Sequence, residues 1–96
     1  MNRAYLQVWC HSERDREIMR DGCSIHVSQS VRDEYVHSVY SKRSSDVPSE
    51  YDYVCDSTHE VYLDDGLSSV LLEKGTIRID EPSFSNLLRM DEIIIK

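Results

Sequence analysis

Apolar and polar positions alternate along much of this 96-residue chain, and a period of two is typical of strands with one face in a core. In residues 23–28, for example, Cys23, Ile25 and Val27 alternate with two serines and a histidine. The pattern predicts strands over residues 4–9, 23–28, 50–55, 60–64, 76–80 and 92–96. The chain is therefore expected to contain more sheet than helix.

A turn signal divides the later part of the chain. Residues 69–73 and 76–80 flank Lys74-Gly75, which predicts a β-hairpin between the two segments. The alternative for the first arm of this hairpin is a short helix over residues 67–72. The two alternatives differ in the face that each apolar side chain would present to the core.

Three segments have the features of helices. Ser12 is a suitable N-cap for residues 13–21, and Gly22 stands where a helix C′ glycine belongs. Residues 30–43 place apolar side chains on one helical stripe, which predicts a helix packed on the sheet. The stripe comprises Val31, Tyr35, Val36, Val39 and Tyr40. A last helix is expected over residues 84–90.

These elements predict the α+β class, with a mostly antiparallel sheet and two or three helices. Two of the helices fall in the first half, and the expected hairpins fall in the second half. The length is that of one domain, and no repeat or linker divides it, so residues 1–96 are expected to form a single small domain.

The most distinctive stretch is acidic. Residues 44–73 contain eight Asp and Glu side chains and no Lys or Arg. We expect strands 50–55 and 60–64 to pair as a hairpin, with most acids at even positions and therefore on one face. Tyr62 lies on the same side and offers a ring to Arg or Lys side chains. The predicted partner-binding residues are Glu50, Asp52, Asp56, Glu60, Tyr62 and Asp64.

The net charge of −7 argues against direct binding to a nucleic-acid backbone, which requires a basic surface. The charge is also uneven, because residues 1–45 have a net charge of +1 and residues 46–96 a net charge of −8. A simple solvated surface would explain an acidic composition. The regular spacing of the acids favours a surface that binds a basic partner.

The cysteines and histidines form no convincing catalytic or metal motif. Structural zinc sites usually use paired cysteines on tight turns, and none is present. Cys23 and His26 are three residues apart on one expected strand, so their side chains should point to opposite faces. We expect three free cysteines, no metal, no cofactor and no enzymatic activity.

The leading hypothesis is a small acidic protein that binds a basic protein and inhibits it by occupying a nucleic-acid-binding surface. Phage anti-defence proteins, including anti-CRISPR proteins, and immunity proteins against nuclease toxins have this general appearance, so the comparison is an analogy of size and charge. No apolar segment resembles a signal peptide or a membrane span, which predicts the cytoplasm of its own cell or of a host cell.

Two alternatives come from other functional classes. The first is a small enzyme or metal protein that uses one of the cysteines with a histidine. The second is a self-assembling subunit, in which the apolar edge formed by Ile93, Ile94 and Ile95 pairs with a copy of itself to give a homodimer. Thiol reactivity and metal content would distinguish the first alternative, and a concentration-dependent mass would distinguish the second.

Overall fold

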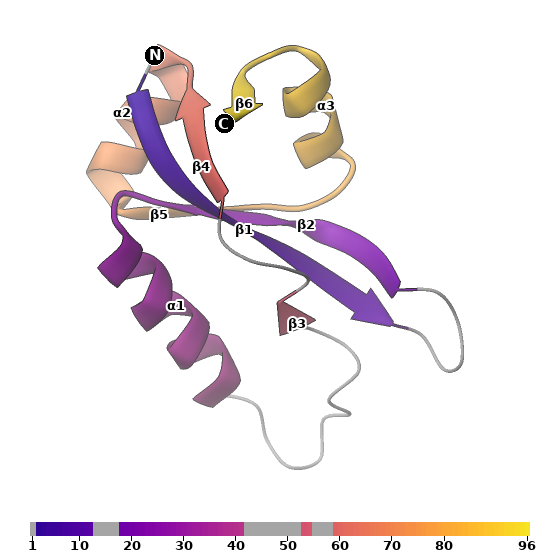
Figure 1. Cartoon of the computed structure of the whole chain (residues 1–96). Coiled ribbons are helices and arrows are strands. Elements are labelled where there is room, and N and C mark those ends of the chain that lie inside the picture. Colours follow the sequence, from indigo (N-terminus) through magenta and orange to yellow (C-terminus); the bar gives the residue numbers. More distant parts are fainter. Residues whose placement is uncertain (1, 13–17, 42–52, 55–58) are drawn as a thin grey trace.

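A computed structural model describes residues 2–12, 18–41, 53–54 and 59–96 (Figure 1). The described elements are β1 (Asn2–Ser12), β2 (Ile18–His26), α1 (Gln29–Ser41), β3 (Tyr53–Val54), β4 (His59–Leu63), α2 (Asp65–Lys74), β5 (Thr76–Ile79), α3 (Ser83–Arg89) and β6 (Ile93–Ile95). Every strand pair among them is antiparallel. The expected α+β class is confirmed.

β1 is the central strand of the sheet, whose order is β5-β2-β1-β4-β6. One edge of β1 pairs with β2, and the other edge pairs with β4 through Asn2–Leu6 and with β3 through Trp9 and Cys10. β3 and β4 therefore run in the same direction along one edge. The expected hairpin between residues 50–55 and 60–64 is wrong, because the long β1 strand is the partner of both segments.

The helix expected over residues 13–21 is also wrong. β2 begins at Ile18, and residues 13–17 lie outside the described part of the chain. Gly22 lies at a β-bulge, because Val8 pairs with Cys23 whereas Cys10 pairs with Arg20. Its φ is 107°, and an added Cβ would lie 2.2 Å from the carbonyl oxygen of Ile79. The glycine thus marks a bulge under close approach from β5 rather than a helix end.

The second expected hairpin is replaced by its helical alternative. α2 begins after Asp64, whose carboxylate accepts a hydrogen bond from the Leu67 amide. It ends at Gly75, with φ of 81°, whose N–H donates to the Leu71 carbonyl oxygen. β5 follows as expected, but it pairs with β2 and not with residues 69–73.

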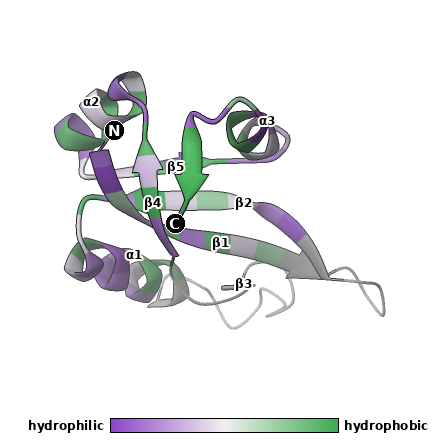
Figure 2. Ribbon diagram, turned by 45° about the horizontal axis from the view of Figure 1, so that its top comes forward, coloured by the Kyte–Doolittle hydropathy of each residue, from purple (hydrophilic) through white to green (hydrophobic). Residues whose placement is uncertain are grey.

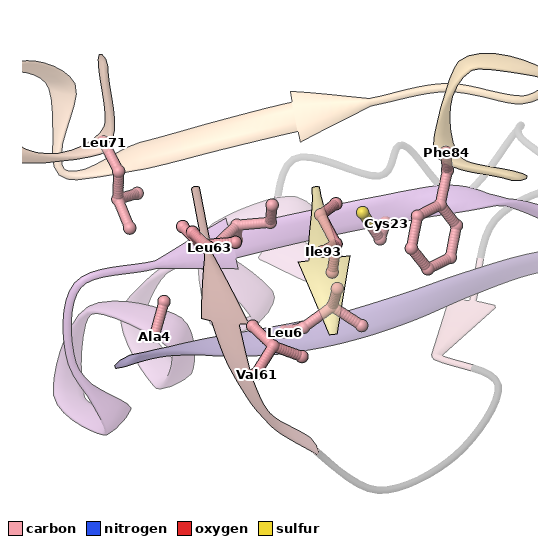
Figure 3. Close-up of a cluster of buried hydrophobic side chains, with 9 residues drawn as sticks. Ala4, Leu6, Cys23, Val61, Leu63, Leu71, Phe84 and Ile93 are labelled. Atoms are coloured by element: carbon pink, nitrogen blue, oxygen red, sulfur yellow. The ribbon is translucent and has the colours of Figure 1, made fainter. Parts of the chain in front are cut away.

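The sheet has two different faces, and helices lie on both of them (Figures 1 and 2). α2 contributes Leu71 to the main core and α3 contributes Phe84. Figure 3 shows these two side chains at opposite ends of the core. The buried side chains of this core come from β1, β2, β4, β6 and these two helices: Ala4, Leu6, Cys23, Ile25, Val61, Leu63, Leu71, Phe84 and Ile93.

α1 packs on the opposite face, against β1 and β2. Ser28 caps it by accepting a hydrogen bond from the Val31 amide. The packing of this helix on the sheet agrees with the apolar stripe in its sequence. The stripe is only half-buried, however, at Val31, Val36 and Val39. The reason is that the sheet surface beneath α1 is largely polar, as described below.

Candidate functional site

The predicted acidic row can be followed only in its second half. Glu50, Asp52 and Asp56 lie outside the described residues. β4 places Glu60 and Tyr62 on one face of the sheet, as their spacing of two requires. The structure therefore brings two of the predicted residues together.

Glu60 is paired with two basic side chains from distant parts of the sequence. Its carboxylate lies 3.1 Å from Lys96 Nζ and 3.9 Å from Arg3 Nη1. The hydrogen bond from Lys96 to Glu60 raises the pKa of Lys96. Residues 44–73 contain no Lys or Arg, but β1 supplies Arg3 and the residue after β6 is Lys96. The charge of Glu60 is thus balanced locally.

Asp64 has a structural role. Its side chain caps α2 at 2.8 Å from the Leu67 amide nitrogen, and its own N–H donates to the Glu92 carbonyl oxygen at 3.1 Å. The even spacing with Glu60 and Tyr62 continues to Asp64, but the strand ends at Leu63. The capping bond fixes the carboxylate toward the helix.

A part of the polar face remains open beside α1. On this face, Tyr62 of β4 lies between Arg3 of β1 and Ile94 of β6, which are its partners in the two neighbouring strands. Tyr62 is half-buried, and 38% of the Ile94 surface is exposed. We call this surface the β4–β6 outer face and define it by Arg3, Glu60, Tyr62, Ile94 and Lys96. It combines an aromatic ring, an aliphatic side chain and balanced charges, a mixture common in protein interfaces.

Ion pairs neutralise most of the described basic residues. Carboxylates lie within 4 Å of Arg3, Arg20, Arg32, Arg78 and Lys96. Among the described residues, Lys74 and Arg89 have no such pair, and neither do the acids Glu34, Asp64, Asp65, Glu73, Asp91 and Glu92. The charge that is not compensated within the described structure is therefore mainly negative.

The Cys23 and His26 side chains lie on opposite faces of β2, as expected for residues three apart. Cys23 belongs to the main core, and burial raises the pKa of its thiol to about 12. A thiol with such a pKa is the opposite of an activated nucleophile. Cys10 is disulfide-bonded, so the expectation of three free cysteines was wrong. Within the described part of the chain, no group of His, Cys, Asp and Glu is arranged to hold a metal ion.

His26 belongs to a buried polar network that the sequence reasoning missed. Its Nε2 lies 2.8 Å from Ser24 Oγ and its Nδ1 lies 2.9 Å from Thr76 Oγ1. Trp9 Nε1 donates to the same Ser24 hydroxyl at 2.8 Å. One neutral tautomer satisfies all three contacts: Ser24 donates to Nε2, and the Nδ1–H donates to Thr76.

α1 covers this network from above. The Tyr35 ring is 5.1 Å from the His26 ring and 6.1 Å from the Trp9 ring, between centroids. Arg32 donates from Nε to Oε1 of the Gln7 side chain at 2.9 Å and makes a second, shorter bond to the same oxygen through Nη2. Burial and the nearby Arg32 guanidinium lower the pKa of His26 to about 4.

Ser24 and His26 occupied the polar side of an alternating strand, which the sequence analysis assigned to solvent. One sequence signal could have indicated the network. Arg32 and Tyr35 are three residues apart and therefore share one face of α1, where they can cover polar side chains of the sheet. All the polar atoms named above have partners, and Gln7, Ser24 and His26 are fully buried. The network is therefore a satisfied interior rather than an open catalytic site.

Comparisons of this chain with protein-family models, with curated proteins and with solved structures find no match. None of the described helices has the length and apolar character needed to cross a membrane. The chain's function is therefore inferred from its own geometry and charge.

Proposed function

We propose that this protein acts by binding a basic protein through its acidic surface, and that it is not an enzyme. The observation that supports a basic partner is the distribution of ion pairs. Five described basic side chains are already paired within the molecule, whereas Glu34, Asp65, Glu73, Asp91 and Glu92 are not. An uncompensated negative surface attracts a positive partner and accelerates its association.

The proposed contact includes Glu50, Asp52 and Asp56, with Glu60 and Tyr62 at its margin. Glu60 adds little to the negative charge of the contact, although it lies in the acidic segment, because Arg3 and Lys96 balance its carboxylate. Tyr62 contributes area and a ring face to the open part of the sheet. Asp64 is assigned to helix capping and is left out of the contact.

The finer proposal is that the basic partner is a nucleic-acid-binding protein and that this chain inhibits it by occupying its basic surface. The net charge of −7 supports this proposal. We further propose that binding takes place in the cytoplasm of its own or a host cell. The disulfide at Cys10 is the feature that opposes this compartment, since disulfides are rare in reducing cytosol.

The test compares two charge-reversed variants that change the net charge equally. Asp52→Lys with Asp56→Lys alters the proposed contact, and Glu34→Lys with Glu73→Lys alters exposed positions on α1 and α2. Each tagged protein is used to capture binding proteins from the same lysate, which are quantified by mass spectrometry.

We expect a basic protein to bind wild type strongly and the helix variant more slowly, because reversing Glu34 and Glu73 weakens the general negative charge that attracts it. Its binding to the Asp52/Asp56 variant should fall further, by about tenfold or more, because this variant alters the proposed contact itself. Its binding should weaken as salt concentration rises, because exposed charges are screened. Equal loss in both variants would indicate a general charge effect without a local contact. Equal retention in both would contradict the proposal.

A further inference from the structure

β6 forms one edge of the sheet and exposes an apolar surface on both faces. Ile94 and Ile95 point to opposite faces and are 38% and 42% exposed. In Figure 2, β6 is the arrow that ends at the C mark, and its colour is that of hydrophobic residues. The other edge strand, β5, differs because its isoleucines, Ile77 and Ile79, are half-buried. An apolar edge strand is a template for pairing with another strand.

The hydrogen bonds between β4 and β6 determine which backbone groups remain at that edge. Asp64 N–H donates to the Glu92 carbonyl oxygen, and Lys96 N–H donates to the Glu60 carbonyl oxygen. In an antiparallel ladder, hydrogen-bonded positions alternate, so residues 92, 94 and 96 direct their backbone groups toward β4. The N–H and C=O groups of Ile93 and Ile95 therefore point away from β4, and they have no backbone partner among the described residues.

We propose that β6 pairs antiparallel with β6 of a second copy of this chain, around a twofold axis at Ile94. Pairing Ile93 with Ile95 of the second copy, and the reverse, uses all the outward backbone groups in four hydrogen bonds. The sheets of the two copies would then become one continuous sheet. No other antiparallel register of β6 on itself uses both residues.

The flanking charges fit this register. It places Glu92 directly opposite Lys96 of the second copy, and the twofold axis repeats this pair on the other side. Opposite charges at directly opposed positions stabilise a strand pair, whereas like charges destabilise it. The segment Glu92-Ile93-Ile94-Ile95-Lys96 is thus complementary to itself when it is read in the reverse direction.

The side chains on the β4–β6 outer face fit as well. Residues 92, 94 and 96 share this face, so Ile94 would contact its own counterpart at the axis. Such positions do not exchange hydrogen bonds, and their side chains lie closest together. Tyr62, which is opposite Ile94 in the same chain, would extend the apolar contact beyond the axis. The exposed area of Ile94 would be covered in this arrangement.

Shortness alone can protect an edge strand, and β6 has only three residues. A monomer with a short, harmless edge is therefore the competing outcome. The two alternatives differ in one property that can be measured. Only pairing in the proposed register makes the mass of the particle depend on the signs of the charges at residues 92 and 96.

Sedimentation velocity from micromolar to millimolar concentration, without a reductant so that the disulfide at Cys10 stays intact, tests the proposal. Wild type is expected to shift from the mass of one chain to twice that mass. Ile94→Lys places two positive charges beside each other at the axis and should weaken association by about tenfold or more. Leu72→Lys, at a position on α2 that is 76% exposed, is the matched control and should associate like wild type.

A charge exchange tests the register. Glu92→Lys and Lys96→Glu should each weaken association by about tenfold, because each creates two like-charge pairs. The double variant Glu92→Lys with Lys96→Glu should restore it to within about threefold of wild type. Circular dichroism and thermal melting at micromolar concentration confirm that each variant is folded, since Lys96→Glu also removes the ion pair with Glu60.

A wild-type chain that stays monomeric at millimolar concentration would overturn the proposal. So would a dimer that resists Ile94→Lys, or a double variant that fails to regain association. The proposal is independent of the proposed function, because the Asp52/Asp56 variant leaves β6 unchanged and should associate like wild type.

Discussion

Glycine shows how one residue type has different roles in this chain. Gly22 lies at a bulge with a positive φ and close to the backbone of β5, whereas Gly66 lies in the first turn of α2. An added Cβ at Gly66 has its closest contact at 3.7 Å, with the Asp64 side chain. The sequence alone does not distinguish the two positions, since both follow an aspartate.

We therefore expect opposite effects of the same substitution. Gly22→Ala should lower the free energy of unfolding by about 3 kcal/mol or more, because of backbone strain and the contact with the Ile79 oxygen. Gly66→Ala should leave it unchanged or raise it by about 0.5–1 kcal/mol, because alanine favours the helix. Chemical denaturation of both variants measures the difference. Equal effects of the two substitutions would contradict the bulge geometry.

At the scale of elements, the two faces of the sheet have different kinds of interior. The face under α2 and α3 is apolar and close-packed, and it includes Val61 with no exposed surface. The face under α1 contains Gln7, Ser24 and His26, all fully buried and hydrogen-bonded. α1 is therefore held by polar and aromatic contacts through Arg32 and Tyr35 more than by its valines.

Two valine substitutions compare the faces. Val61→Ala should lower the free energy of unfolding by about 2 kcal/mol, because it leaves a cavity in the apolar core. Val36→Ala, on the half-buried stripe of α1, should lower it by less than about 1 kcal/mol, since alanine partly compensates through its helix propensity. Urea denaturation gives both values. A larger loss for Val36→Ala would mean that the valine stripe is the main support of α1.

At the scale of the whole molecule, the buried network connects four elements. Trp9 on β1, His26 on β2, Thr76 on β5 and Tyr35 on α1 all contact it. Arg78 of β5 lies 5.3 Å from the Trp9 ring centroid and pairs with Asp21 and Asp80. Protonation of His26 would place a positive charge beside Arg32 in this interior. Folding should therefore depend on pH.

The sign follows from the two pKa values of His26. It is about 4 in the folded protein and 6.5 in the unfolded chain, so only the unfolded chain binds a proton between these values. The free energy of unfolding should fall as pH falls from about 6.5 to about 4, by up to about 3 kcal/mol. Above pH 6.5 this contribution should be constant.

Guanidinium denaturation at pH 7 and at pH 4.5 measures this dependence. His26→Gln should reduce the pH dependence in this range, even if it also lowers stability at pH 7. An unchanged dependence in His26→Gln would show that His26 remains accessible to protons in the folded state.

The sequence by itself determined the features that depend on local pattern. The alternation in residues 23–28 predicts β2 in part, and the apolar segments at both ends predict β1 and β6. Period two also placed Glu60 and Tyr62 on one face, because successive side chains of any strand alternate. The stripe in residues 30–43 identified α1, since its spacing is that of a helix.

Only the tertiary structure decided the features that depend on distant partners. Residues 18–22 have no strong strand pattern, but they pair with β1 as a continuation of a hairpin. Glu60 is balanced because the sheet brings Arg3 and Lys96 beside it. Ser24 and His26 are buried because α1 covers them. In each case the deciding contact joins segments whose sequences contain no information about their distance in space.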